Sequence, residues 1–436
     1  MESYSTVFMK QMKFLLGILG VLMVCFCDAT VRGGVTFTNL FSFSGTNGIE
    51  PEGQLVQTPD GNLYGTARDT TLEKWGNGNF GFNGNGSIFR IATNGAFSVL
   101  ATFAHTNGNG AYPRAGLTLG KDGILYGTTT GGGLNRQGTV FKITTNGTLT
   151  ILALFAGTNG ALPVAGLLRK GDAFLGTTLA GGIKDRMHPG GPNDPVGMGT
   201  VFSINSAGII NTLIFFDKTN GEFPNGELIQ GNDGNLYGTT SFGGFGWLVH
   251  NNLTNQFSEY GYGTLFKITP HGAFSTLAAF NGYNGQGPTA IRLSKDGSLY
   301  GITSNGGATN TANPDETYAW QPFSGSGTIF KITPKGEFKT LVLFNGVKGS
   351  NPDSFILGND GNFYGTTSGG GANNLGTIFK LTPNGTFTTL YSFTEGSGSW
   401  PNGFRLMQGI DRNLYGTTKR SGQNQCGSIF RLTLPQ

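Results

Sequence analysis

The chain has few charged residues, few cysteines and no long apolar run outside its N-terminus. Charged residues make up 12% of its 436 residues, about half of the usual ~25%. The 28 Lys and Arg and the 24 Asp and Glu are scattered along the chain. No basic run forms the electrostatic footprint that nucleic-acid binding needs. We therefore expect no nucleic-acid partner.

The N-terminus has the pattern of an export signal. Lys10 and Lys13 precede the mostly apolar run Phe14–Phe26, and Cys27-Asp-Ala29 follows with small residues suited to cleavage. The run is short for a membrane span, which takes about 20 residues. We predict a signal peptide over residues 1–29 and no membrane span after its removal, with an uncleaved anchor as the alternative.

Cysteine is nearly absent from the rest of the chain. Two of the three cysteines, Cys25 and Cys27, lie within the predicted signal, so the mature chain keeps Cys426 alone. An intrachain disulfide is therefore excluded there, and the hydrophobic core must supply the stability.

Glycine and aromatic residues are abundant instead. The sequence has 76 Gly and 35 Phe, and aromatic residues make up 12% of it. This apolar content excludes a disordered chain. Glycine combined with Phe, Leu, Ile and Thr is typical of many short strands joined by tight turns.

One motif, Leu-Tyr-Gly-Thr or a close variant, recurs seven times. Its glycines are Gly65, Gly127, Gly176, Gly238, Gly301, Gly365 and Gly416. The third copy lacks the Tyr, the fifth has Ile302 in place of the Thr, and the seventh has Arg412 where the preceding turn has Gly. Repetition of a unit of about 50 residues predicts a repeat architecture.

Each unit has room for four short strands, a to d. In the fourth copy we expect them at 225–230, 236–240, 264–269 and 274–280, with an Asp233-Gly234 turn between the first two. Strand c holds a Phe and strand d ends in Leu-x-x-Phe in every copy. Seven such units predict an all-β, seven-bladed β-propeller of four-stranded antiparallel blades.

The two ends of the chain predict how the ring closes. The chain starts with a lone strand d, Phe37–Phe43, and finishes after a lone strand c, Gly427–Thr433. We expect a single propeller over 35–434, whose last blade combines 401–434 with 35–43 and so leaves no open sheet edge.

The copies also resemble the GloVer tandem-repeat family of exported bacterial proteins. The resemblance rests on Leu-Tyr-Gly-Thr-Thr-x-x-Gly-Gly, Gly-Thr-x-Phe-Lys-Ile-Thr and Phe-x-x-Leu-x-x-Phe, and it covers residues 35–434. It implies export, often with a C-terminal anchor, and implies no particular activity. This chain ends at Gln436, directly after the last strand, so we expect release to the outside or display on the surface without that anchor.

The insertions predict which side of the disc is functional. The a–b and c–d turns are minimal, whereas the b–c loops of blades 1, 3, 4 and 5 are long, at about 67–85, 179–198, 241–262 and 304–326. Functional residues concentrate on loops that a rigid scaffold holds. We call the side that carries the b–c loops and d–a crossings the loop face.

The rare residues fall on this loop face. Trp75, Trp247 and Trp320 lie in long b–c loops, and Trp400 lies in the last d–a crossing. His188 and His250 lie in b–c loops and His105 in a d–a crossing, whereas His271 lies in a c–d turn on the other face. We predict ligand binding by Trp75, Trp247, Trp320, Trp400, His105, His250 and Arg114. The alternative is that the Trp side chains only anchor their loops.

Each d–a crossing contains Gly-x-x-Pro. The residue two positions after each Pro is small, which we attribute to close packing near the axis. These residues are Gly53, Ala115, Ala165, Gly226, Ala290, Ser354 and Gly403. The residue directly after each Pro is mostly polar and predicts a ring at the channel mouth or an ordinary solvated rim. These residues are Glu52, Arg114, Val164, Asn225, Thr289, Asp353 and Asn402.

Catalytic and metal motifs are weak. Glu52 and Asp353 could face each other as a glycosidase pair, and His188, after Lys184-Asp-Arg-Met187, could serve a polysaccharide lyase as a base. Asn-Asp-Gly-Asn at 232–235 and 359–362 lacks the ligand series of a calcium loop and suits a hairpin turn. We expect no metal and no cofactor.

These observations favour a secreted or surface-exposed monomer that binds carbohydrate or another extracellular polymer on the loop face. Trp and Tyr rings would stack on sugars, and loop Asn side chains would bind hydroxyls. Two alternatives remain: a polysaccharide lyase or glycoside hydrolase that uses carboxylates at the channel mouth, and a protein-interaction scaffold with a broad apolar patch.

Overall fold

A computed structural model describes most of the chain after the predicted signal. The described residues are 30–32, 34–70, 72–74, 80–82, 84–104, 108–182, 197–244, 246–251, 256–307, 325–398, 406–420 and 426–435. All regular structure in these ranges is β. No helix long and apolar enough to cross a bilayer occurs among them.

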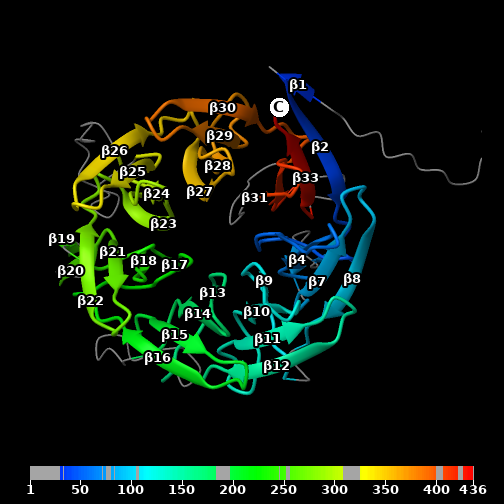
Figure 1. Cartoon of the computed structure of the whole chain (residues 1–436), viewed down its shortest axis with the longest axis horizontal. Helices are drawn as coiled ribbons and strands as arrows, with labels where there is room; N and C mark the ends of the chain where they lie inside the picture. The colour runs from blue at the N-terminus through cyan, green and yellow to red at the C-terminus, as the bar shows by residue number, and fades with distance from the viewer. Residues whose placement is uncertain are drawn as a thin grey trace, which may run out of the picture.

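Seven sheets form a ring, each with its strand a near the axis and its strand d at the rim (Figure 1). Blade 1 contains β3 (Val56–Gln57), β4 (Leu63–Ala67), β7 (Ser87–Ile91) and β8 (Phe97–Thr102). Blade 2 contains β9 (Thr118–Leu119), β10 (Leu125–Thr129), β11 (Thr139–Ile143) and β12 (Leu149–Leu154). Blade 3 contains β13 (Leu168–Lys170), β14 (Ala173–Thr178), β15 (Thr200–Ile204) and β16 (Ile210–Phe215).

The remaining blades follow the same order. Blade 4 contains β17 (Ile229–Gln230), β18 (Leu236–Thr240), β21 (Thr264–Ile268) and β22 (Phe274–Ala279). Blade 5 contains β23 (Gln286–Leu293), β24 (Leu299–Asn305), β25 (Thr328–Ile332) and β26 (Phe338–Leu343). Blade 6 contains β27 (Ser350–Leu357), β28 (Phe363–Gly369), β29 (Thr377–Leu381) and β30 (Phe387–Ser392). The predicted fold, a seven-bladed propeller of antiparallel four-stranded blades, is confirmed.

Blade 7 contains strands from both ends of the chain. Its inner strands are β31 (Met407–Gln408), β32 (Leu414–Thr418) and β33 (Ser428–Thr433). The strand β2 (Val35–Ser42) pairs with β33 in antiparallel register, from Thr36↔Thr433 to Ser42↔Ser428. A short strand, β1 (Thr30–Arg32), pairs with the outer side of β2. Figure 1 shows β2 beside β33.

Close packing explains the glycine of the repeated motif. In blade 4, a Cβ atom on Gly238 would lie 2.4 Å from Cζ of Phe266 and 2.8 Å from Cδ2 of Leu228. The strand c Phe thus lies directly over the strand b glycine, and the same contact recurs at the other six motif glycines. Any larger residue would displace the aromatic ring.

A hydroxyl pair joins strands b and c in six blades. In blade 4, the hydroxyls of Thr240 and Thr264 lie 2.8 Å apart, and equivalent pairs occur in blades 2, 3, 5, 6 and 7. Blade 1 has Ala67 opposite Ser87, and the buried Ser87 Oγ has no hydrogen-bond partner among the described residues.

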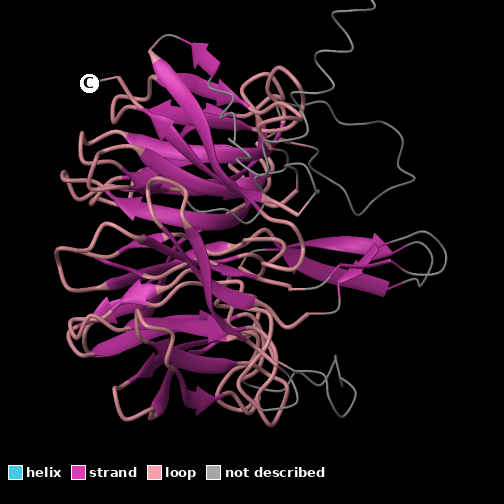
Figure 2. Ribbon diagram, turned by 90° about the vertical axis from the view of Figure 1, so that its right-hand side faces the viewer, coloured by secondary structure: helices cyan, strands magenta, loops and turns pink. Residues whose placement is uncertain are grey.

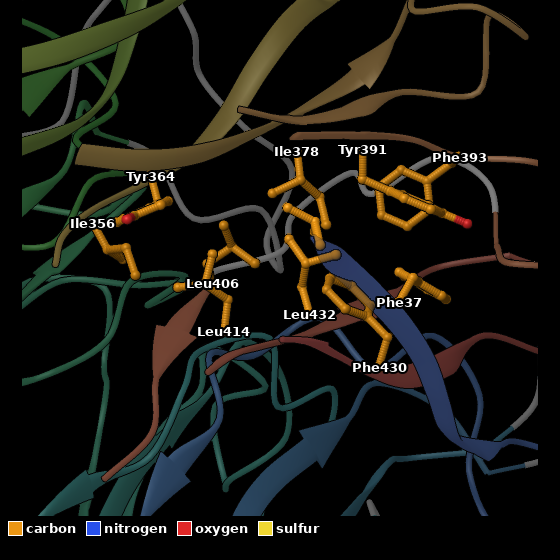
Figure 3. Packing of buried hydrophobic residues seen from close by; sticks show 11 residues of the cluster. Phe37, Ile356, Tyr364, Ile378, Tyr391, Phe393, Leu406, Leu414, Phe430 and Leu432 are labelled. Carbon is orange, nitrogen blue, oxygen red and sulfur yellow. The ribbon is translucent and has the colours of Figure 1, made fainter. Parts of the chain in front are cut away.

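The hydrophobic core lies between adjacent blades. In the interface of blades 6 and 7, Phe37 of β2 stacks on Tyr391 of β30, with ring centroids 4.4 Å apart. Phe37 also stacks on Phe430 of β33 at 5.2 Å, and Figure 3 shows these rings together with aliphatic side chains from both blades. Because adjacent blades cover both faces of each sheet, every residue of strand b is buried in blades 1, 2, 4 and 7.

The d–a crossings bind each blade to the preceding one. The residue before the Pro has a positive φ at Glu50, Tyr112, Leu162, Phe223, Gly287 and Asn351, between 51° and 61°. Such a backbone costs about 1–3 kcal/mol in non-glycine residues. Each of these residues donates its backbone N–H to a carbonyl of the preceding blade. In that blade the acceptor residue comes directly before the glycine that leads into strand c, and Glu50 donates to Cys426 in this way. Each following Pro packs on that glycine: a Cβ on Gly427 would lie 2.7 Å from Pro51 Cδ.

The predicted role of the small residues near the axis is confirmed at Gly53 and Gly226. A Cβ on Gly53 would lie 2.4 Å from Thr66 Oγ1 and 2.6 Å from the Ala115 carbonyl oxygen. A Cβ on Gly226 would lie 2.6 Å from Thr239 Oγ1 and 2.7 Å from the Thr289 carbonyl oxygen. Adjacent inner strands therefore approach too closely for a side chain at Gly53 and Gly226.

Candidate functional site

Two β-hairpins extend the loop face. The b–c loop of blade 1 contains β5 (Leu72–Lys74) and β6 (Phe80–Phe82), and that of blade 4 contains β19 (Gly246–Asn251) and β20 (Gln256–Gly261). These pairs are the two-stranded sheets of the described structure. Figure 2 shows paired strands standing off one flat side of the disc. The loop face therefore carries protruding structure on two blades.

Most of the predicted aromatic and histidine site residues lie outside the described residues. Trp75, Trp320, Trp400, His105 and His188 belong to this group. Trp247 and His250 lie on β19, in register with Tyr260 and Phe257 of β20. Ligand binding by the four Trp residues, His105 and His250 stays a prediction, as does the role of His188 as a base.

The buried Asp69 holds both ends of the blade 1 insertion together. Its Oδ1 atom accepts the backbone N–H of Thr70 at 3.1 Å and that of Gly84 at 2.6 Å. Burial raises the pKa of Asp69, and the two backbone donors oppose this effect. The hairpin β5–β6 thus stands on a closed loop base.

An ion-pair cluster surrounds the predicted ring residue Glu52. Its Oε1 lies 2.9 Å from Lys419 Nζ and 3.7 Å from Arg68 Nη1, and its Oε2 lies 3.4 Å from Arg114 Nε. The neighbouring Glu50, with a side chain only 3% exposed, lies 2.8 Å from Arg68 Nη1 and 3.5 Å from Lys419 Nζ. Three cations therefore face two buried carboxylates.

This cluster lies at the junction of the first and last blades. Arg68 and Lys419 occupy equivalent positions directly after strand b of blades 1 and 7, where the other copies have Thr130, Leu179, Ser241, Ser304 and Ser368. Both carboxylates lie in the crossing that leads from β2 to blade 1. We call these residues (Glu50, Glu52, Arg68, Arg114 and Lys419) the seam cluster.

The seam cluster bears on the predicted catalytic role of Glu52. A carboxylate that three cations already neutralise is suited to holding two blades together rather than to proton transfer. Its predicted partner Asp353 lies half-buried on β27 of blade 6, whereas the ion-pair partners of Glu52 come from blades 1, 2 and 7. Arg114, with its side chain 38% exposed, is the described member that best remains accessible to a ligand.

A cavity of about 230 Å³ lies beside the inner strands of blades 1 to 5. Its polar lining comes from Gln54 of blade 1, Thr118 of blade 2, Glu227 of blade 4 and Arg292 of blade 5. Arg292 Nη2 lies 3.4 Å from Glu227 Oε2, and both side chains are less than one-fifth exposed. We call this space the axial cavity.

Contacts to neighbouring strands position the polar groups of the axial cavity. Arg292 Nη1 donates to its own strand, to the Ile291 carbonyl, at 2.8 Å. Gln54 Nε2 donates to the Leu406 carbonyl of blade 7 at 2.7 Å, and Thr118 Oγ1 donates to the Leu167 carbonyl of blade 3 at 2.6 Å. The polar groups are therefore held before any ligand arrives.

Sequence reasoning missed the axial cavity, although a signal was present. The residue three positions after the crossing Pro is Gln54 in blade 1 and Glu227 in blade 4, but Gly116 and Gly166 in blades 2 and 3. Because some copies have a polar side chain at this position and others have glycine, the sequence indicates a space near the axis that differs from blade to blade. Arg292 gives a similar signal, because the residue four positions after the crossing Pro is Leu in blades 1 to 4 and Arg in blade 5.

The Asp-Gly turns on the opposite face are hairpin turns, as predicted. Asp233 Oδ2 accepts hydrogen bonds from Asn235 Nδ2 at 2.6 Å and from Tyr237 OH at 2.7 Å. Asp360 makes the same two contacts, with Asn362 and Tyr364. No group of three or more His, Cys, Asp or Glu residues suited to a metal occurs in the described part of the chain.

The fold is similar to that of several solved structures. It resembles a catalytically inactive variant of virginiamycin B lyase from Staphylococcus aureus, solved with quinupristin, with a TM-score of 0.56, 15% identity, and coverage of 92% of this chain and 100% of that one. It also resembles the extracellular domains of a hybrid two component system and a one component system from B. thetaiotaomicron, with TM-scores of 0.51 and 0.53 and identities of 12% and 10%. These two similarities cover 91% and 90% of this chain and 40% of the chain of each solved structure. Identities this low show a shared fold alone.

The sequence was compared with curated proteins and with family models. No curated protein matches it. The model of the Gloeobacter/Verrucomicrobia repeat matches residues 27–188 and 316–436, which is more than half of the chain. The chain therefore belongs to the Gloeobacter/Verrucomicrobia repeat family.

Proposed function

We propose that the protein is a secreted or surface-exposed binding module that recognises carbohydrate on its loop face. The observation that carries this proposal is the asymmetry of the disc. The scaffold combines protruding hairpins, an exposed cation at Arg114 and a polar axial cavity. The face opposite the loop face has tight turns, in which a carboxylate such as that of Asp233 accepts hydrogen bonds from neighbouring side chains. Ligand sites combine apolar walls with a few fixed polar groups.

The export pattern of residues 1–29 supports a location outside the cell. Two of the similar structures are extracellular domains, which agrees with that location but shows only the fold. On this proposal the ligand is a glycan or another polymer of the cell exterior.

Binding of residues 30–436 to a glycan array tests the proposal. We expect selective binding that is lost in the Trp75/Trp247/Trp320→Ala triple variant and weakened in Arg114→Met. Ile410→Ala is the matched control, because Ile410 is 73% exposed in the a–b turn of blade 7 on the other face. All variants should have the thermal stability of the parent.

Three other outcomes would change the proposal. Absence of binding by the parent would refute it and favour a protein ligand. Unchanged binding by the triple variant would assign the Trp residues to loop anchoring. Release of shorter sugars from a bound glycan would make the protein a polysaccharide-cleaving enzyme instead.

A further inference from the structure

We propose that the axial cavity binds one uncharged pyranose ring, with Glu227 and Arg292 holding two adjacent hydroxyl groups. This inference rests on the proposed function, because the ring would be one residue of the recognised glycan. It assigns a ligand class to side chains that the sequence pattern did not single out.

The size of the axial cavity favours a single sugar ring. Sites for drug-sized ligands usually have about 300–1,000 Å³, whereas this cavity has about 230 Å³. An oligosaccharide would therefore extend beyond it. The inner strands of five blades contribute to its wall, so it is a feature of the ring as a whole rather than of one loop.

Glycine creates the space into which Glu227 reaches. A Cβ atom on Gly166 would lie only 2.4 Å from Glu227 Oε1, so the carboxylate of blade 4 lies against the bare backbone of blade 3. Gly116 of blade 2 lies instead against the backbone of blade 1, where a Cβ would lie 2.8 Å from the Gln54 carbonyl oxygen. A side chain at Gly166 would displace the carboxylate.

The polar groups match a pair of sugar hydroxyls. A carboxylate accepts hydrogen bonds on two oxygens, and a guanidinium donates in a planar fork. Glu227 and Arg292 lie 3.4 Å apart, which is a suitable spacing for one to accept from and the other to donate to neighbouring hydroxyls. The amide of Gln54 adds a further polar group at the wall.

The charge of the described lining selects against acidic sugars. One carboxylate and one guanidinium give no net charge. Because Arg292 already pairs with Glu227 at 3.4 Å, a uronate carboxylate would lose its hydration without an added cation to compensate. Leu117 and Leu167 supply apolar wall, against which the C–H face of a pyranose can pack. The axial cavity thus combines the polar edge and apolar face that an uncharged sugar needs.

Saturation-transfer NMR and thermal shift with free D-glucose, D-galactose, D-mannose and D-glucuronate test the inference on residues 30–436. We expect at least one neutral hexose to bind, and glucuronate to bind at least about tenfold more weakly. Glu227→Gln removes the charge, and Gly166→Ala displaces the carboxylate without removing it. Each should lower hexose affinity by about tenfold or more.

Gly166→Ala is expected to fold, and a surface carboxylate supplies a matched control. Gly166 lacks the positive φ that would forbid alanine, and the atom in its way is the end of a flexible side chain, so Gly166→Ala should fold. Glu337→Gln is the control, because Glu337 is an exposed carboxylate in the c–d turn of blade 5. It should leave hexose binding unchanged.

Several results would overturn the inference. These are a failure of all three hexoses to bind, equal binding of glucuronate, and hexose binding that persists in both variants. A purely structural ion pair predicts a lower melting temperature in Glu227→Gln with no hexose signal in the parent. Glycan-array binding without hexose binding would refute this inference and leave the proposed function intact, whereas hexose binding without array binding would do the reverse.

Discussion

Neutralising Glu50 should loosen the junction between the first and last blades. Its carboxylate is 3% exposed and faces Arg68 at 2.8 Å and Lys419 at 3.5 Å. Removing one partner of a buried ion pair usually costs 3–5 kcal/mol. Arg68 and Lys419 are 26% and 20% exposed and keep Glu52 as a partner, so we expect about 2–3 kcal/mol for Glu50→Gln.

Cys426 provides the assay for this change. Its side chain is 1% exposed, its carbonyl accepts the Glu50 N–H at 3.1 Å, and burial raises the pKa of its thiol. It is the single cysteine of residues 30–436, so labelling by a thiol reagent under native conditions reports opening at this junction. A loss of 2–3 kcal/mol corresponds to labelling about 30- to 150-fold faster.

An exposed ion pair supplies the control. Lys121 and Asp172 lie 3.4 Å apart with side chains 63% and 88% exposed, and such pairs contribute about 0–1 kcal/mol. Asp172→Asn should therefore leave Cys426 labelling almost unchanged. Equal labelling of Glu50→Gln and the parent would refute the view that the seam cluster holds the junction closed, as would equal acceleration by Asp172→Asn.

Three further predictions concern the repeated elements. Gly238→Ala should cost about 1–3 kcal/mol, read from the urea midpoint, because its methyl group would collide with the Phe266 ring; an unchanged midpoint would contradict this packing. Ala67→Thr should stabilise by about 1 kcal/mol in the same assay, because it gives blade 1 the hydroxyl pair of the other six blades; no gain would contradict that account. Burial and hydrogen bonds to Asp residues raise the pKa of Tyr126 and Tyr415 to about 12. Since these folded-state values lie above the ordinary value near 10, the stability they contribute is complete below about pH 10 and is lost as the pH rises through about 12. The melting temperature should fall in that window, and the fall should be smaller in a variant with Phe at both positions.

The repeated parts of the fold could be predicted from the sequence because each copy carries the same local signals. The predicted strand b of blade 4 has the observed bounds, Leu236–Thr240, and strands c and d differ by one residue. The sequence predicts strand a at 225–230, but β17 contains only Ile229–Gln230. The preceding residues follow the close inter-blade contacts at Gly226 instead of a regular ladder.

The parts that could not be predicted depend on distances between blades. The sequence shows that the motif glycine repeats, but the reason for it, the Phe ring of strand c that lies over it, depends on the pairing of strands b and c. The positive φ of Glu50 runs against the usual preference of a residue before proline for extended conformations. It is compensated by a hydrogen bond to Cys426, which is 376 positions away in the sequence.

The seam cluster and the axial cavity are both found by one comparison, in which the residues at equivalent positions of the seven copies differ. What the copies share builds the ring, because every interface must accept the same glycine, Phe and Pro contacts. Residues that the copies do not share have no role in that common geometry and must be explained by their own surroundings.

The charges at Glu50, Arg68 and Lys419 replace uncharged residues where the ring closes, so they are explained by the junction. Glu227 replaces a glycine and extends over Gly166 toward the axial cavity, where a buried carboxylate is costly unless it is paired. Arg292 provides that pairing at 3.4 Å. The same comparison therefore separates the seam cluster, which is explained by the junction, from the axial cavity, which we propose as a binding site.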